Sequence, residues 1–156
     1  MRPMRRKDRE MSREFALAVA DKCEWTTVSF VTPEGEPYAV PVSAVRVGES
    51  LYFHSAREGR KAECIAACPK VHAVCVGDVE RSRDKFTTGY ECAMIEGVCR
   101  EVTDEAEKLS ALRAISEKYT PGIMSRFDEE VRVSLPRTAV FRIDIENISG
   151  KAKILK

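Results

Sequence analysis

The stretch Leu51–Lys61, LYFHSAREGRK, decides the fold, because a short apolar strand pattern passes within it into the start of a helix. The strand pattern ends at Ser55, and Gly59 is followed by two cations, Arg60 and Lys61, where the helix is expected to begin. A hydroxyl, two cations and the N–H groups of a helix N-terminus together suit a phosphate group. The sequence therefore predicts a site for a phosphorylated cofactor at this junction.

Length and charge limit what such a site can belong to. The chain has 156 residues, about the length of one domain, and we expect a single domain over residues 1–156. Its 26 Lys and Arg nearly balance its 25 Asp and Glu, and the two signs are interspersed, so no nucleic-acid partner is expected. No apolar run approaches the roughly 20 residues that cross a bilayer, and the start is charged. We expect a cytoplasmic protein without membrane contact.

The cysteines are expected to be reduced, because disulfides are uncommon in the cytoplasm. All of them lie in apolar or periodic segments, and the chain has no CxxC pair. Small buried thiols are therefore favoured over a structural metal site, and no metal is expected. The cysteines are Cys23, Cys64, Cys68, Cys75, Cys92 and Cys99.

Apolar spacing and turn residues predict a mainly β chain with flanking helices. Six strands linked mostly by hairpins favour a small closed or nearly closed antiparallel barrel over a doubly wound sheet. Helices are expected over Met4–Lys22 and Gly59–Cys68 and from Asp104 to Tyr119, with a turn of helix at Ile123–Phe127. Strands are expected over Trp25–Val31, Tyr38–Val47, Leu51–Ser55, Val71–Val79, Tyr90–Val102 and Thr138–Ile148.

Single residues add local expectations. Gly97 inside a strand pattern indicates a bulge or close packing. Glu107, three residues after Asp104, is placed as in a capping box. Pro41 cannot donate a ladder hydrogen bond, so its strand belongs at an edge or a bulge. An open edge there can pair with the polar rim of a flat ring such as a flavin; the alternative is that Pro41 only ends a pairing.

Other chemistries find less support. His54 is a candidate for ring contact or proton transfer, or it is a polar strand residue, whereas His72 is better explained by packing. The glycines make neither GxGxxG nor a phosphate loop, so a Rossmann domain lacks its main evidence. No serine lies in a GxSxG elbow, and hydrolase chemistry is unsupported.

Three segments carry a family resemblance. They are AVPVSAVRVGESLYFHSAREGRK between Tyr38 and Ala62, the short helix ending at Pro69, and YECAMIEGVCREV at Tyr90–Val102. Together they resemble the pyridoxamine 5′-phosphate oxidase-like split β-barrel flavoproteins, in particular the 5-nitroimidazole resistance (Nim-type) subgroup. The resemblance implies an FMN-binding split β-barrel, antiparallel, six-stranded and Greek-key-like. It also implies a homodimer with two cofactor sites at the subunit interface.

The resemblance also implies roles for particular residues. His54 is the catalytic candidate, and Cys92 stands where the oxidases carry a flavin-contacting glutamine. A thiol is a poorer donor than an amide, so this contact is expected to differ. By similarity, Val40, Pro41, Val42 and Ser43 run along the isoalloxazine edge, His54 and Ser55 lie by the ring and ribityl chain, and Arg60 and Lys61 hold the phosphate. Phe53 is also expected among the cofactor-binding residues.

One departure from the family bears on the substrate. The true oxidases resemble one another in a C-terminal segment with a tryptophan and arginines, but the one tryptophan here is Trp25. Oxidation of pyridoxamine phosphate is therefore not expected. The resemblance implies an FMN-dependent oxidoreductase that passes electrons from NAD(P)H to a small nitroimidazole or nitroaromatic acceptor. Two alternatives stay open: a non-catalytic flavin- or haem-binding carrier or sensor, with His54 or His72 as iron ligand, and a cofactor-free interaction domain.

Overall fold

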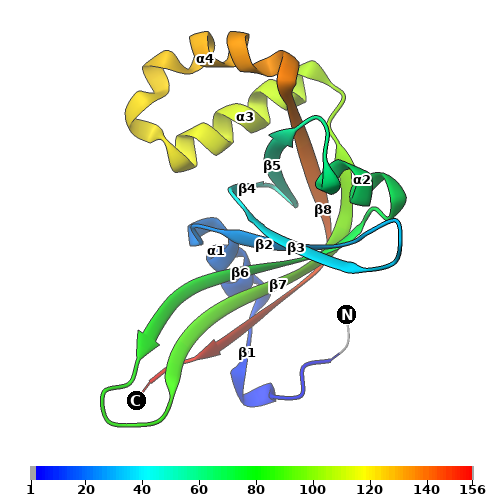
Figure 1. Cartoon of the computed structure of the whole chain (residues 1–156). Coiled ribbons are helices and arrows are strands. Elements are labelled where there is room, and N and C mark those ends of the chain that lie inside the picture. The colour runs from blue at the N-terminus through cyan, green and yellow to red at the C-terminus, as the bar shows by residue number, and fades with distance from the viewer. Residues whose placement is uncertain (1–2, 156) are drawn as a thin grey trace.

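The structure, a computed structural model, describes residues 3–155. A twisted antiparallel sheet forms its body, in the order β3-β2-β6-β7-β8-β5-β4, with β1 paired to β8 (Figure 1). The strands are β1 (Glu10–Met11), β2 (Thr26–Val31), β3 (Pro37–Val42), β4 (Ala44–Val47), β5 (Ser50–Ala56), β6 (Lys70–Arg81), β7 (Thr88–Glu101) and β8 (Thr138–Lys153). The helices are α1 (Arg13–Lys22), α2 (Arg60–Ala67), α3 (Glu105–Tyr119) and α4 (Phe127–Ser134), with 3₁₀ turns η1 (Lys7–Arg9), η2 (Pro121–Arg126) and η3 (Leu135–Arg137).

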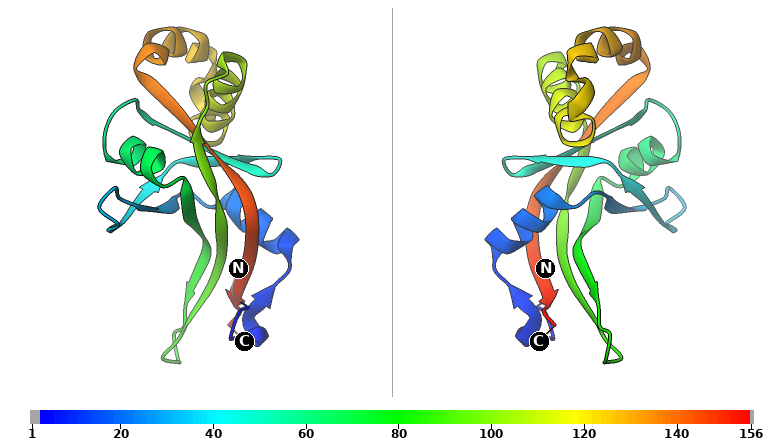
Figure 2. Two further views of the ribbon diagram at one scale, coloured as in Figure 1. Left: turned by 90° about the vertical axis from the view of Figure 1, so that its right-hand side faces the viewer. Right: turned by 90° about the vertical axis from the view of Figure 1, so that its left-hand side faces the viewer.

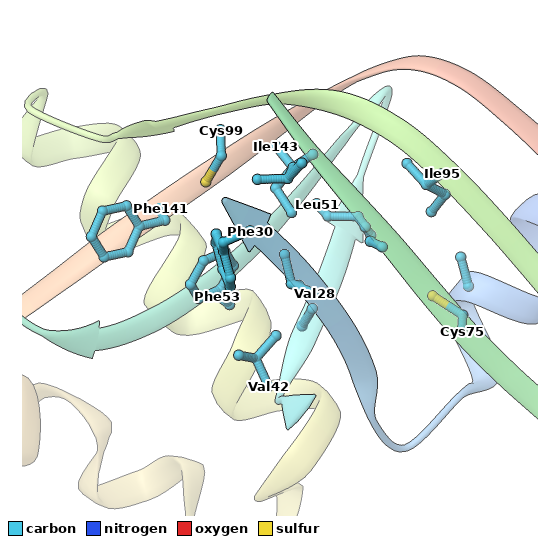
Figure 3. Packing of buried hydrophobic residues seen from close by; sticks show 14 of the residues in the cluster. Val28, Phe30, Val42, Leu51, Phe53, Cys75, Ile95, Cys99, Phe141 and Ile143 are labelled. Atoms are coloured by element: carbon cyan, nitrogen blue, oxygen red, sulfur yellow. The ribbon is translucent and has the colours of Figure 1, made fainter. Parts of the chain in front are cut away.

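The core lies inside the curved sheet. Alternation of apolar and polar residues along the strands turns one side chain in two toward it. Phe53 on β5 and Phe141 on β8 are buried and stack with ring centroids 5.4 Å apart. Figure 3 shows side chains from β2, β3, β5, β6, β7 and β8 converging on this cluster. Burying such rings is the largest contribution that single side chains make to a small core.

The strand expected over Tyr38–Val47 is two strands, and this is the main correction to the predicted fold. β3 pairs with β2, whereas β4 pairs with β5, at the opposite end of the sheet order. Each half is held by its own hairpin, so the chain has to turn between them, at Ser43. With β1, the split raises the number of strands in the described residues from the expected six to eight. The sheet is not closed, because its end strands β3 and β4 are joined by the chain instead of a hydrogen-bond ladder.

The N-terminal helix is also shorter than expected. The first half of the predicted Met4–Lys22 helix is instead the turn η1 and the short strand β1. Ser12 separates the two halves, because its hydroxyl accepts a hydrogen bond from the Phe15 N–H at 3.1 Å and caps α1. The residues before it pair with the end of β8.

A second helix follows α3, where only a turn at Ile123–Phe127 was expected. In α4, Phe127 is buried and Val131 packs beside it against Leu112 and Val140. These contacts form a small second core between the helices and the outer face of the sheet. The last strand, β8, also continues past the expected Ile148 because it pairs with β7 from Phe141 to Lys153.

Two of the local expectations can be checked directly. The register of β7 against β8 shifts between Glu96 and Gly97, which confirms the bulge. Pro41 lies on β3, an edge strand, as predicted. The capping box is only half formed: Asp104 accepts from the Glu107 N–H at 2.7 Å, but the Glu107 carboxylate bonds elsewhere, to Tyr52 and Arg142.

The molecule is elongated. Helices α3 and α4 lie at one end, and the β6–β7 hairpin projects at the other beside the end of β8 (Figures 1 and 2). We call this projection, residues 78–90 with 151–155, the arm. Within residues 3–155, none of the helices has both the length and the apolar character needed to span a bilayer.

Candidate functional site

The junction between β5 and α2 is built on a glycine. Gly59 precedes the first residue of α2 with φ at +116° and ψ at 177°, a conformation that side chains other than hydrogen strain. No side chain caps this end of the helix. The first N–H groups of α2 therefore point out of the helix without a protein side chain to bind them.

Two cations and a hydroxyl lie at the same junction. Arg60 and Lys61 occupy the first turn of α2, and the Arg60 guanidinium sits 4.5 Å from the ring centroid of Tyr38 on β3. This contact brings the N-terminus of α2 to β3, as the site prediction requires. Within residues 3–155 neither cation forms an ion pair, and the half-buried Ser55 hydroxyl has no hydrogen-bond partner. The junction thus offers unused donors and positive charge to an anion.

The edge of β3 forms the second part of the site. In the described chain β3 pairs only with β2, so its other edge leaves backbone groups open. Two hydrogen bonds fix the backbone just after this edge strand. Lys118 Nζ and Tyr119 OH each donate a hydrogen bond to the Ala44 carbonyl oxygen at 2.9 Å. Of the four predicted edge residues, Val42 is buried, Pro41 is exposed, and Val40 and Ser43 are half-buried.

Neighbours on β5 point to opposite faces, which separates three predicted site residues. Phe53 is fully buried in the core, and its backbone lies between β4 on one side and β8 on the other, so the structure does not offer it to a ligand. His54 points outward, under the helices, and lines a cavity of about 240 Å³ with Ile115, Met124 and Phe127. Desolvation in these surroundings lowers the pKa of His54, so its ring is neutral at pH 7 and keeps one N–H donor. Ser55 lies on the other face, toward the junction.

Cys92 is not brought to the junction within one chain. It lies on β7 opposite Lys151, and two strands, β2 and β6, separate β7 from β3. Burial raises the pKa of the Cys92 thiol, so the group is a neutral thiol at pH 7. A single chain therefore does not bring the Cys92 thiol to a flavin bound at the junction.

Sequence reasoning missed the helical wall of the His54 cavity and the double anchor on Ala44. The cavity wall includes Met124 and Phe127, in the part of the chain where only a turn was expected. The spacing of Phe127, Val131 and Leu135 at intervals of four is a helix signal that predicts it. Tyr119 stands at the end of the helix expected from Asp104, and nothing in its spacing indicates the hydrogen bond to Ala44.

The cysteines and histidines form no metal-type cluster in the described part of the chain. Among residues 3–155, no three or more His, Cys, Asp or Glu side chains lie close enough together to hold an ion. All six cysteines are free thiols.

The fold defines the class: an antiparallel split barrel, here with unpaired donors at a strand–helix junction. The pyridoxamine 5′-phosphate oxidase family profile matches residues 12–152, and the chain belongs to this family. No curated protein matches it.

Solved structures share the fold. A candidate 5-nitroimidazole antibiotic resistance protein from Bacteroides thetaiotaomicron superposes with a TM-score of 0.77 at 24% identity, over 92% of this chain and 86% of that one. The flavocytochrome Anf3 from Azotobacter vinelandii gives 0.78 at 22% identity, over 98% and 73%. An FAD and heme binding protein from Mycobacterium smegmatis gives 0.76 at 25% identity, over 93% and 73%.

Proposed function

We propose that this protein is an FMN-dependent oxidoreductase. The observation that carries the proposal is the unpaired set at the junction: the Ser55 hydroxyl, the Arg60 and Lys61 cations and the uncapped N-terminus of α2. This set fits the phosphate of a mononucleotide, which carries two negative charges and several strong acceptor oxygens near pH 7.

The remaining residues fit the rest of the cofactor. The open edge of β3 offers backbone donors and acceptors to the polar rim of an isoalloxazine ring, and the Lys118 and Tyr119 bonds to Ala44 hold that edge in place. Bound FMN would supply the two-electron redox chemistry of the reaction. The chain binds and orients the cofactor at Ser43, Ser55, Arg60 and Lys61.

The likeness to the Mycobacterium smegmatis FAD and heme binding protein supports a flavin as the cofactor class. We favour FMN over FAD because the junction has one helix N-terminus and no GxGxxG sequence accompanies it. His54 is neutral and carries one N–H donor, so it can hydrogen-bond an acceptor without charging. We propose that electrons come from NAD(P)H and pass to a small nitroimidazole or nitroaromatic acceptor.

We also propose a homodimer with the cofactor sites at the interface. The arm projects from the body and exposes Val79, Phe86 and Ile154, an apolar surface on which a second copy can pack. Cys92 lies apart from the junction of its own chain, and a second copy can supply it to the site. Sedimentation equilibrium of the wild type and of Phe86→Ser tests the assembly; a monomer at every concentration contradicts it.

Titration with FMN and riboflavin tests the cofactor, because the two differ only in the phosphate. We expect wild-type protein to bind FMN tightly. A charge-assisted hydrogen bond contributes about 1.5–3 kcal/mol, so Lys61→Ala should weaken FMN roughly 10- to 150-fold. The same substitution should leave riboflavin unchanged. Lys70→Ala, an exposed lysine just beyond the other end of α2, is the matched control and should match the wild type for both ligands.

Two results contradict the cofactor assignment. One is a protein that binds no flavin. The other is equal weakening of FMN and riboflavin by Lys61→Ala, which places the lysine's effect outside the phosphate contact. Anaerobic mixing of the flavin-loaded protein with NADH or NADPH, followed by a nitroimidazole, tests the donor and acceptor separately. Loss of flavin absorbance and its return on adding the acceptor are the expected readouts.

A haem-binding carrier or sensor is the second candidate, favoured by the position of His54 at an apolar cavity. A neutral imidazole is a suitable axial ligand for haem iron. The cavity, at about 240 Å³, is smaller than the roughly 300–1,000 Å³ typical of ligand pockets, so haem entry requires α3 and α4 to move. A Soret band that appears with added haem and is lost in His54→Ala supports this candidate.

A further inference from the structure

Two buried cysteines from distant parts of the chain share one hydroxyl. Cys23 ends α1 and Cys75 lies on β6, facing Thr26 on β2 in register. The Thr26 Oγ1 lies 3.6 Å from the Cys23 Sγ and 3.4 Å from the Cys75 Sγ. All three side chains are almost fully buried, and Figure 3 shows the Cys75 sulfur directed into the interior. The two thiols therefore form a pair within the core.

This pair differs chemically from the other buried thiols. The neighbouring Cys75 thiol lowers the pKa of Cys23, and the Thr26 hydroxyl lowers it further, while burial opposes this shift; the Cys23 Sγ also lies 3.3 Å from the Ala20 carbonyl oxygen. The pKa of Cys75 is raised by the Cys23 thiol and by burial. Burial raises the pKa of Cys99 to about 12. Only a thiolate is strongly nucleophilic, so Cys23 is the attacking group and Cys75 the thiol that follows.

Of the two cysteines, Cys23 is the one that borders a surface pocket, although only 2% of it is exposed. A surface pocket of about 400 Å³ is lined by Cys23 together with Trp25, Val76 and Asp78. Cys23 is the C-cap of α1, and its side chain packs in the core with the sulfur 3.3 Å from the Ala20 carbonyl oxygen. Cys75 does not line this pocket. An oxidant therefore meets Cys23 first.

We propose that Cys23 and Cys75 are a redox-active thiol pair that a hydroperoxide converts into a disulfide. The Cys23 thiolate attacks the outer oxygen of the hydroperoxide, the O–O bond breaks, and the alkoxide or hydroxide takes up a proton and leaves. Cys23 becomes a sulfenic acid. The Cys75 sulfur then attacks the Cys23 sulfur, the S–O bond breaks, and the leaving hydroxide takes the Cys75 proton as water. The two thiols lose two electrons, which the hydroperoxide accepts.

The pair stands independently of the cofactor proposal, because it requires neither the junction nor a flavin. The disulfide joins the end of α1 to β6, two elements that already pack against each other. A closed S–S bond needs its sulfurs at about 2.05 Å, so the two sulfurs, which now both lie beside the Thr26 hydroxyl, have to move together.

Hydrogen peroxide titration of the folded, reduced protein tests the proposal. After removal of peroxide by catalase, the protein is unfolded in an alkylating reagent and its peptides are mapped by mass spectrometry. We expect one product that has lost two hydrogen atoms, with Cys23 linked to Cys75 and the other four thiols alkylated. Dithiothreitol should restore all six. Cys23 should react at least about ten-fold faster than Cys99.

Variants separate the two steps. Cys75→Ser should stop at a Cys23 sulfenic acid, trapped by dimedone, because no second thiol follows. Cys23→Ser should leave Cys75 unmodified, and Cys64→Ser, the matched control, should oxidise like the wild type. Six alkylated thiols after peroxide, or a disulfide between another pair, overturns the proposal. The wild-type peptide map tests the proposed Cys23–Cys75 disulfide even if a variant fails to fold.

Discussion

Replacing Gly97 by alanine tests the packing of the two longest strands. The Cβ of alanine would lie 2.3 Å from the Asp144 carbonyl oxygen and 2.9 Å from the Ile143 Cγ2. The Asp144 carbonyl oxygen belongs to the backbone in the middle of β8, so it cannot rotate away as a side chain can. Relief requires β7 and β8 to part by about 1 Å, and a gap of that size loses up to about half of each contact's attraction.

The expected cost is at the upper end of the range for overpacking, about 3 kcal/mol. A domain of this size is stable by roughly 5–15 kcal/mol, so Gly97→Ala removes a substantial part of the free energy of unfolding. For 150–250 residues each kcal/mol shifts the midpoint by roughly 2–4 °C, which gives a fall of roughly 6–12 °C. Thermal unfolding followed by circular dichroism measures it.

Two other glycines are matched controls. A Cβ at Gly122 meets nothing within 4 Å, so Gly122→Ala should change the midpoint little. A Cβ at Gly77 meets the Glu91 Oε2 at 2.8 Å and the Glu91 Cβ and Lys22 Cε at 3.1 Å; the carboxylate end can move aside and the other two contacts are only tight, so Gly77→Ala should cost less than the Gly97 substitution. A Gly97→Ala midpoint within about 1 °C of the wild type would refute the packing argument.

Three further predictions concern single side chains near the site. Tyr119→Phe removes one of two donors to Ala44 and should lower the free energy of unfolding by about 1 kcal/mol in urea titrations; an unchanged midpoint would show that Lys118 alone suffices. Burial lowers the pKa of His54, so the unfolded chain takes up the proton more readily and stability should fall as the pH drops below about 6.5. Part of the His54 side chain stays in contact with solvent, so this slope should be well under 1.4 kcal/mol per pH unit, and His54→Gln should flatten it; a variant with the wild-type slope contradicts the assignment. Phe53→Ala should cost about 3–5 kcal/mol, measured by denaturant unfolding, and a cost below about 1 kcal/mol would contradict its place in the core.

The regular parts of the fold are predictable from the sequence because local signals agree with the tertiary structure. The strand–helix junction at Leu51–Lys61 and the helix after Asp104 follow from alternation, helical spacing and a capping residue. The bulge at Gly97 follows from a glycine inside a strand pattern. In each case the residues concerned are enough to specify the geometry.

The errors arise where a distant partner decides the local conformation. Residues 38–47 read as one strand, and only their pairing with β2 at one end and β5 at the other separates them at Ser43. Residues 4–11 have helical spacing, but Glu10 and Met11 pair with the end of β8, far away in the sequence. A single sequence contains no signal for such pairings.

The same pairings explain why a site forms at this place. A closed barrel joins its end strands through a ladder, and the edge of β3 then has no free backbone groups. Here Ser43 carries the chain from β3 to β4 without such a ladder, and Pro41 sits on the edge that stays open. The Arg60–Tyr38 contact brings the uncapped N-terminus of α2 to that edge. The strand prediction missed the break between β3 and β4. The same break leaves the backbone groups of β3 free for a cofactor to bind.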